Sequence, residues 1–278
     1  MGISETKLTM ESEKWAFKDL LHGNNYKFFS SSHPTKPSSA GVVLIIHKKW
    51  ERQIGSIEKH DGRIIAANFQ TKKSKICVIQ TYLPSNRTES NKYQRIIRNI
   101  ITNKSSQNFH IIIMGDFNVT YNPLLDRSSP PSGFRPSWKP EIALFEFLED
   151  MGFTDVQQQW EPDITSPTWH GHLSYSHIDY IWTSATLSDK HLISFQNERI
   201  KDITNSDHTL LFVELANWHL FQKDPITKRS KAKSRKIIDL KQTTEEHWLE
   251  YQTYIEQKIE QDNIKDRLSD ILSRPNKQ

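Results

Sequence analysis

The sequence has little cysteine, little glycine and no long apolar run. Its single cysteine, Cys77, excludes a disulfide scaffold within the chain and a cysteine-rich zinc site. Only 9 of the 278 residues are glycine, so each glycine in a predicted turn is informative. No apolar stretch approaches the roughly 20 residues that a membrane-spanning helix needs. We therefore expect an intracellular protein without a membrane partner.

The positive charge of the chain is concentrated near its C-terminus. The formal net charge is +4, and the segment from Lys223 to Lys241 holds eight basic and two acidic residues. The rest of the chain therefore carries about −2, which is not the net charge of a strongly basic nucleic-acid binder. The 8 Trp, 8 Tyr and 13 Phe residues are enough to fill a sizeable core.

The composition divides the chain into three segments. Residues 1–217 alternate short apolar runs with polar turns and predict one domain, whereas residues 218–242 are polar and basic and predict a linker. Residues 243–272 predict an amphipathic helix, because a capping-box spacing precedes an apolar stripe of Trp248, Tyr251, Ile255 and Ile259. Such a stripe is typical of a helix that packs on a partner surface. The basic linker is expected to be solvated, and DNA contact by the linker is the alternative.

Strands and helices follow in an irregular order within residues 1–217. Apolar runs predict strands at residues 42–46, 64–69, 75–83, 110–114, 178–182 and 209–215. Apolar side chains spaced three and four apart predict helices at residues 11–21, 90–102 and 141–151. Asp61-Gly62 marks a turn, and residues 68–75 connect a hairpin. This order predicts an α/β sandwich rather than regular βαβ repeats.

The run at residues 110–114 leads into two polar side chains. The run is apolar throughout, which predicts a strand buried on both faces. Asp116 and Asn118 follow it, two residues apart and therefore on the same face. This position is suited to holding a water molecule and a metal-bound phosphate. An Asx-type turn that closes the strand explains the same two residues equally well.

Further polar positions lie within or beside apolar strands. Asp179 interrupts one of them, and a buried carboxylate there needs a partner such as a histidine. Asp207 and His208 precede another, and a carboxylate beside an imidazole suits metal binding and the stabilisation of charge on a phosphate. An Asp-His pair alone is a weak signal. The three segments in this order are far more specific.

Together these segments resemble the exonuclease–endonuclease–phosphatase superfamily, the fold of DNase I, over about residues 1–217. The motifs are Ile3-Ser4-Glu5-Thr6, Thr81-Tyr82-Leu83-Pro84-Ser85, Gly115-Asp116-Phe117-Asn118, Ile178-Asp179-Tyr180-Ile181 and Ser206-Asp207-His208. Residues 41–45 and Pro167-Thr168-Trp169 also match. Leu124-Leu125-Asp126-Arg127 and the helix after the basic linker are most similar to endonuclease domains of non-LTR retrotransposons. The resemblance implies a four-layer α/β sandwich with a C-terminal helical extension.

The resemblance also implies which residues bind the metal and the phosphate. Glu5 would bind a divalent metal, Mg²⁺ or alternatively Mn²⁺, since these prefer oxygen ligands. Asp207 would lie near this metal. Tyr82 would contact a phosphate oxygen.

Four other residues would carry out the hydrolysis itself. Asp116 would orient and deprotonate the attacking water, and Asn118 would hold the phosphate and help to place that water. His208 would donate to the phosphate, while Asp179 would fix the orientation of His208 and favour its cationic form. In-line hydrolysis by these groups needs no covalent intermediate.

The sequence departs from the superfamily pattern in two places. The superfamily has an earlier strand with an asparagine that supports the metal site, whereas this sequence begins just before the motif of Glu5. We therefore expect an N-terminally truncated domain with an open sheet edge, a poorly covered core and weak Mg²⁺ binding by a frayed Glu5. Abasic-site enzymes also carry an asparagine where this chain has Ser85, and Asn86 comes one place later.

The leading hypothesis is a Mg²⁺-dependent endonuclease of retrotransposon type that nicks DNA in the nucleus. A phosphatase of the same fold, acting on inositol phosphates or sphingolipids, is a second reading, because the late motifs serve phosphoester cleavage generally. A catalytically inactive remnant or binding module is a third. The missing strand favours this third reading, and the intact acidic residues and His208 oppose it.

Overall fold

The fold is seen in a computed structural model of the chain. It describes residues 1–9, 11–16, 25–71, 74–123, 125–128, 142–162, 166–201, 204–216, 244–261 and 263–264. The chain divides into two compact units, Met1–Lys228 and Arg229–Gln278. The described part of the second unit is helix α8 (Glu245–Gln261) with residues 244, 263 and 264. All other described elements belong to the first unit.

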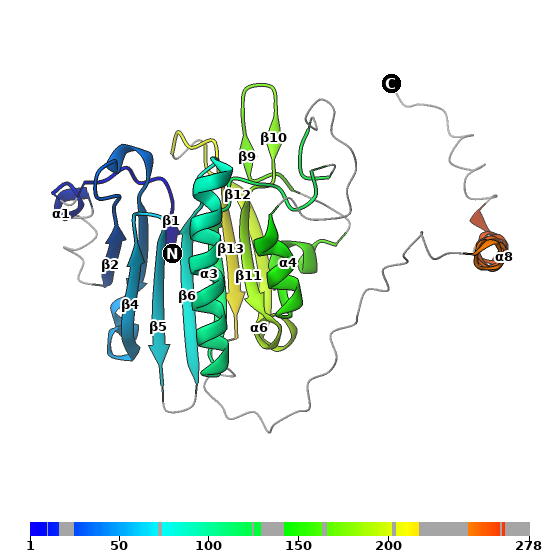
Figure 1. The fold of residues 1–278 in the computed structure, drawn as a ribbon, viewed down its shortest axis with the longest axis horizontal. Helices are drawn as coiled ribbons and strands as arrows, with labels where there is room; N and C mark the ends of the chain where they lie inside the picture. Colours follow the sequence, from blue (N-terminus) through cyan, green and yellow to red (C-terminus); the bar gives the residue numbers. More distant parts are fainter. Residues whose placement is uncertain are drawn as a thin grey trace. The chain divides into compact units, whose positions relative to one another are not determined.

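A six-stranded sheet forms the centre of the first unit (Figure 1). Its order is β4 (Ile54–His60), β5 (Ile64–Gln70), β6 (Lys75–Tyr82), β7 (His110–Asp116), β11 (Asp179–Ser184) and β8 (Phe153–Asp155). Neighbouring strands are antiparallel except β6 and β7, which are parallel. Helix α3 (Arg87–Ser106) provides the crossover between these two strands.

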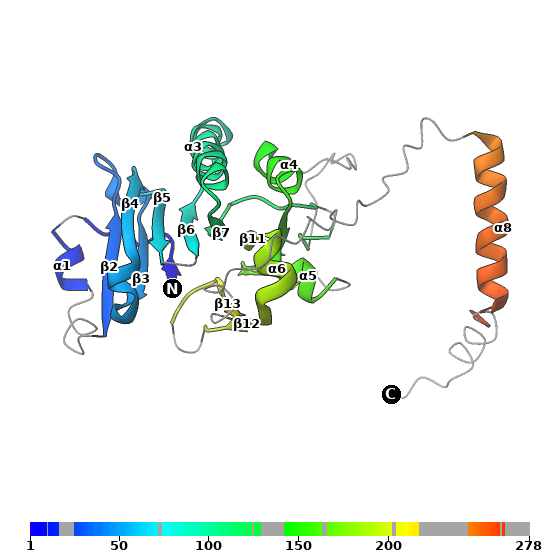
Figure 2. The same cartoon turned by 90° about the horizontal axis from the view of Figure 1, so that it is seen from below.

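Two helices cover one face of this sheet. Figure 2 shows α3 and α4 (Ala143–Asp150) on the same side. The main core lies between them and the sheet, where Ile97 and Phe145 of the helices meet Ile79, Ile111 and other fully buried strand residues. Asn86 begins α3, because its side chain accepts a hydrogen bond from the backbone N–H of Glu89 at 3.0 Å.

The opposite face carries two smaller groups of strands. One is the sheet β1 (Gly2–Ile3), β3 (Val42–His47) and β2 (Tyr26–Ser31), in the order β1-β3-β2. The other is the hairpin of β12 (Leu192–Arg199) and β13 (Thr209–Leu215). Each group buries apolar side chains against the six-stranded sheet, the first through Leu44 and the second through Phe195. This layered arrangement is the mixed α/β, DNase I-like fold that the resemblance implies.

The remaining described elements are short. They are helices α1 (Glu13–Ala16), α5 (Val156–Trp160) and α6 (Ala185–His191), 3-10 helices at Pro37–Ser39 and Lys48–Gln53, and the hairpin β9 (Trp169–His170) and β10 (Tyr175–Ser176). None of the helices in the described residues has both the length and the apolar character to cross a membrane.

The predicted elements agree with the structure best where the sequence pattern is strongest. All six predicted strands and the helix at residues 90–102 are present, the helix being longer at both ends. The Asp61-Gly62 turn is present too, and both residues have positive φ. The predicted helix at residues 11–21 appears as the short α1, and residues 17–24 lie outside the described part. Strands β2, β4, β8 and β12 were not predicted.

One prediction about strand burial is wrong. Strand β7 is not fully buried on both faces: Ile111 and Ile113 are completely buried beneath the helices, whereas Ile112 and Met114 on the other face are only partly buried. The first residue of the chain is hydrogen-bonded to β3. The α-amino group of Met1 donates to the backbone oxygen of Ile45 at 2.9 Å, and the Ile45 N–H donates back at 2.8 Å.

Gly115 allows β6 and β7 to lie close together just before the polar end of β7. Its φ is +136°, and an added Cβ would collide with the backbone oxygen of Thr81 on β6. We predict that Gly115→Ala lowers the free energy of unfolding by about 2–5 kcal/mol, because it adds a backbone clash to conformational strain. Urea denaturation measures this change.

Gly152 provides the matched control. Its φ is +76°, but nothing lies within 4 Å of an added Cβ. Gly152→Ala should therefore cost only the conformational strain, about 1–2 kcal/mol. Equal losses for the two substitutions would contradict the proposed close approach of β6 and β7.

Candidate active site

Three neighbouring strands place polar side chains at the same end of the six-stranded sheet. Asp116 is the last residue of β7, and its register partners are Tyr82 on the parallel strand β6 and Asp179 on the antiparallel strand β11. Pairing of the strands therefore brings together residues that are about a hundred positions apart in the sequence. Asp116 is buried, and Asp179 is partly buried.

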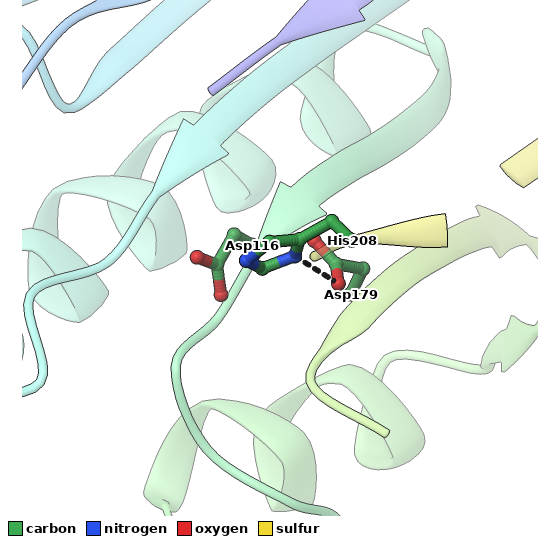
Figure 3. Close-up of side chains that lie close together, drawn as sticks. All are labelled: Asp116, Asp179 and His208. Atoms are coloured by element: carbon green, nitrogen blue, oxygen red, sulfur yellow. Dashed lines mark hydrogen bonds and ion pairs between the residues drawn. The ribbon is translucent and has the colours of Figure 1, made fainter. Parts of the chain in front are cut away.

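His208 reaches this group from the hairpin on the other layer. Its Nδ1 lies 2.8 Å from Oδ2 of Asp179, so the imidazole N–H donates to the carboxylate. Ligand atoms of Asp116, Asp179 and His208 all lie within 4.8 Å of one another. Figure 3 shows the imidazole ring between the two carboxylates, hydrogen-bonded to that of Asp179. The partner that the sequence required for a buried Asp179 is therefore His208.

The charges around His208 favour its cationic form. Burial alone lowers the pKa of the imidazole, but the hydrogen bond from His208 to Asp179 and the negative charges of Asp179, Asp116 and Asp207 outweigh this effect. The pKa of His208 is raised to about 9 as a result. The ring is therefore a cation and a donor at neutral pH.

Asp116 has the properties of a base that works near neutral pH. Burial, followed by the charge of Asp179, raises the pKa of Asp116 to about 7, and the charge of His208 partly offsets this rise. Oδ1 of Asp116 accepts the backbone N–H of Asn118 at 2.7 Å, and Oδ2 accepts the Asn118 Nδ2 at 3.2 Å. This is an Asx-type turn, so the two interpretations of this segment are compatible. Asn118 has φ +52°, a conformation that asparagine tolerates well.

Tyr82 and Glu5 form a second group beside Asp116. The Tyr82 hydroxyl donates to Oε1 of Glu5 at 3.2 Å, and the Lys7 ammonium lies 3.4 Å from the same oxygen. Burial and then the charge of Glu5 raise the pKa of Tyr82 to about 12, so the hydroxyl stays protonated. Arg63, which is 4% exposed, lies with its guanidinium 4.8 Å from the Tyr82 ring centroid.

Asp207 lies on the exposed side of the site. Its Oδ2 accepts a hydrogen bond from the Trp169 indole N–H at 2.8 Å, and its charge contributes to the raised pKa of His208. Asp207 and Glu5 are not members of the compact cluster of Asp116, Asp179 and His208. The structure thus joins six predicted residues in three hydrogen-bonded pairs, Asp116–Asn118, Asp179–His208 and Tyr82–Glu5. Both predicted metal ligands, Glu5 and Asp207, lie outside the compact cluster.

Thr168 holds the histidine and its carboxylate partner together, and sequence reasoning assigned it no role. It is completely buried, and its Oγ1 accepts the backbone N–H groups of Ile178 at 3.0 Å and Asp179 at 2.9 Å. Its backbone oxygen accepts the N–H of Thr209, next to His208, at 2.7 Å. The Pro167-Thr168-Trp169 segment was noted only as a motif match, which was the available signal.

The model of the Endonuclease/Exonuclease/phosphatase family matches residues 1–208. The chain belongs to this family. No curated protein matches the sequence. The family is one of hydrolytic nucleases and phosphodiesterases, and its members generally use divalent metals.

Several solved structures share the fold of this chain. A 3′ phosphatase, NExo, from Neisseria bound to a product DNA hairpin is 17% identical, with a TM-score of 0.62 over 77% of this chain and 88% of that one. An AP endonuclease from Archaeoglobus fulgidus is 16% identical, with a TM-score of 0.60 over 77% and 87%. The endonuclease domain of TRAS1, a telomere-specific non-LTR retrotransposon, is 11% identical, with a TM-score of 0.50 over 76% and 94%.

The contact between Asp179 and His208 generates a direct prediction. Asp179→Asn removes the hydrogen-bonded negative charge, so the pKa of His208 should fall from about 9 towards its ordinary value of about 6.5. At pH 7.5 the ring would change from mainly cationic to mainly neutral. NMR titration of the imidazole measures this pKa. Asp189→Asn, on the exposed surface of α6, is the control, and a pKa that stays near 9 in Asp179→Asn would contradict the assignment.

Proposed function

We propose that the chain is a metal-dependent phosphodiester hydrolase that nicks DNA. The observation that carries this proposal is the compact cluster of Asp116, Asp179 and His208, in which a base and a cationic donor lie side by side. Phosphodiester hydrolysis needs both groups, because a water must lose a proton while the phosphate gains negative charge.

Asp116 takes the role of the base. Its carboxylate is held by two hydrogen bonds from Asn118, and its pKa of about 7 is close to the working pH. Near pH 7 a base with this pKa is ionised in about half of the molecules, and its ionised form is strong enough to accept a proton from water. Nδ2 of Asn118 also donates to the backbone oxygen of Leu83 at 2.7 Å, which fixes the amide beside the attacking water.

His208 and Tyr82 are the donors to the phosphate. His208 is cationic because of Asp179, and its Nε2 side is left for the substrate while Nδ1 is bonded to that carboxylate. Tyr82 keeps its proton to high pH and adds a neutral donor on the β6 side of Asp116. Donors held in place in this way stabilise the extra charge of the transition state without reorganisation.

A divalent cation fits the oxygen-rich donors of the site. Besides burial, the negative charges of Asp179 and Glu5 raise the pKa of Asp116. A cation bound beside Asp116 would relieve the repulsion among these three carboxylates. We assign Glu5 as the main ligand and Asp207 as a nearby one, with Mg²⁺ as the metal and Mn²⁺ as a substitute. When bound, the cation supplies Lewis-acid polarisation of the phosphate.

DNA is the proposed substrate, and the nucleus is the proposed compartment. The fold likeness to NExo, whose structure holds a product DNA hairpin, and to the TRAS1 endonuclease domain supports DNA. The basic segment from Lys223 to Lys241 supplies the positive charge that DNA binding needs. A retrotransposon origin is consistent with the motifs after the central strand.

Supercoiled plasmid nicking tests this function. With Mg²⁺ present, the chain should convert supercoiled to open-circular DNA, and EDTA should abolish the conversion. Asp116→Asn and His208→Ala should each lower the nicking rate by about 10²-fold or more, because each removes one acid–base or electrostatic group. Both variants should keep the melting temperature within a few degrees.

Matched controls separate this function from its alternatives. Asp189→Asn makes the same chemical change as Asp116→Asn on the exposed surface of α6 and should leave the rate unchanged. A parallel phosphate-release assay with inositol phosphates identifies a phosphatase. If the folded chain neither nicks DNA nor releases phosphate, it is an inactive binding module, and the proposed function is wrong.

A further inference from the structure

Helix α3 concentrates positive charge on the outer surface of the first unit. It has five basic residues and one acidic residue, which give it a net charge of +4. Residues 1–222 as a whole have a formal net charge of +1, so the remainder of this segment carries −3. One helix therefore carries a net positive charge that the rest of the segment lacks.

The two acidic residues at this helix are already paired with other cations. Oε1 of Glu89 lies 3.5 Å from Nη2 of the buried Arg63. Oδ2 of Asp61, in the turn before β5, lies 2.8 Å from Nζ of Lys92. These pairs take up one cation of α3 and its single carboxylate, and the other basic residues of the exposed face remain.

Three of these basic residues, Arg87, Arg95 and Arg98, form an arginine stripe along α3. All three are exposed. With 3.6 residues per turn they lie within about 80° of one another around the helix axis, and they span about 16 Å along it. The guanidinium of Arg98 lies 4.8 Å from the ring centroid of Phe147 on α4. Among the described residues, none of the three forms an ion pair with a carboxylate.

The arginine stripe does not serve the helix itself. Arg87 is the first residue of α3, where the helix dipole disfavours a cation. Arg95 and Arg98 are three residues apart, so two like charges are neighbours on the helix surface. A bound anion would remove both unfavourable interactions.

The other exposed residues of α3 indicate which kind of anion fits. Every exposed residue of the helix is polar, and none is aromatic or aliphatic. A protein partner needs an apolar centre to its interface, whereas interfaces with DNA are polar and strongly basic. Single-stranded nucleic acids bind on aromatic stacking platforms, which this face lacks. The phosphate backbone of a duplex is therefore the ligand that fits best.

The position of α3 connects the arginine stripe with the candidate active site. The helix begins five residues after Tyr82, at the end of β6 that carries the site, and it ends before the start of β7. Since β6 and β7 are parallel, α3 runs from the site end of the sheet towards the opposite end (Figure 1). The stripe thus starts beside the site and leads away from it.

We propose that the arginine stripe binds the phosphate backbone of duplex DNA next to the segment that occupies the site. The proposal rests on the proposed function, because it takes DNA as the ligand. Its length of about 16 Å corresponds to about five base pairs, at 3.4 Å per phosphate of one strand. Contacts to phosphates carry no sequence information, so the stripe adds affinity and leaves target preference to the site.

The salt dependence of DNA binding tests this proposal with the full chain. The probe is a labelled duplex of about 30 base pairs, held in EDTA so that no strand is cut, and fluorescence anisotropy measures its Kd over a range of salt concentrations. Replacing Arg87, Arg95 and Arg98 together by glutamine should reduce the slope of log K against log salt by about 2.7, since each lost phosphate contact removes about 0.9. At about 0.1 M salt the Kd should rise at least about tenfold.

Two further variants separate charge from packing. Because Arg98 also contacts Phe147, the pair Arg87→Gln and Arg95→Gln leaves that contact in place, and it should reduce the slope by about 1.8. Arg87→Lys with Arg95→Lys keeps both charges and should leave the slope within about 0.3 of that of the unmutated chain.

A matched control removes the same charge elsewhere. Arg52 and Lys59 are exposed, on the 3-10 helix Lys48–Gln53 and on β4. Arg52→Gln with Lys59→Gln should leave the slope unchanged within about 0.3. The basic segment from Lys223 to Lys241 is present in every variant, so the differences in slope report α3 alone.

Several results would overturn the proposal. An unchanged slope in the triple glutamine variant, or an equal reduction in the control, would show that the arginine stripe does not contact DNA. Competition by a polyglutamate peptide as effective as that by unlabelled duplex, at equal charge, would assign the stripe to an acidic polypeptide. The outcome is independent of nicking: a chain that does not nick but loses slope contradicts only the proposed function, and a chain that nicks without losing slope contradicts only the stripe.

Discussion

The hydrogen bond between His208 and Asp179 determines the electrostatics of the whole site. It joins the hairpin layer to the six-stranded sheet, and it keeps the imidazole cationic despite burial. The same cation limits the rise in the pKa of Asp116 that burial and then the charge of Asp179 cause. One ion pair therefore provides the donor to the phosphate and keeps the pKa of the base close to neutral pH. Thr168 supports it by binding the backbone beside each partner.

The two faces of the six-stranded sheet are covered to different extents. Helices α3 and α4 bury one face of the central sheet almost fully, whereas β1-β3-β2 and β12-β13 cover the other face with a groove between them. The groove explains why Ile112 and Met114 remain partly exposed in a strand whose sequence is apolar throughout. On β7, Ile112 and Met114 line the groove, and Asp116 at the end of the same strand belongs to the site.

The sequence predicts the elements and the central cluster because local signals are strong there. The polar residues Asp116, Asp179 and His208 lie within or next to apolar runs, so their types and positions stand out. Strands β2, β4 and β12 were missed because their partners, not their composition, make them strands. The role of Thr168 could not be predicted, since it depends on hydrogen bonds to residues 10 and 41 positions away. The groove depends on the spacing of two strand groups, which no local pattern encodes.

The central claim is that Asp179 acts through His208 on the reacting phosphate. A double-mutant cycle on the nicking rate tests it directly, with Asp179→Asn, His208→Ala and the double variant compared with the unmutated chain. Groups that act as a unit give non-additive losses, so the double variant should be no slower than His208→Ala alone. If the two losses multiply instead, Asp179 acts independently of His208, and this account of the site is wrong.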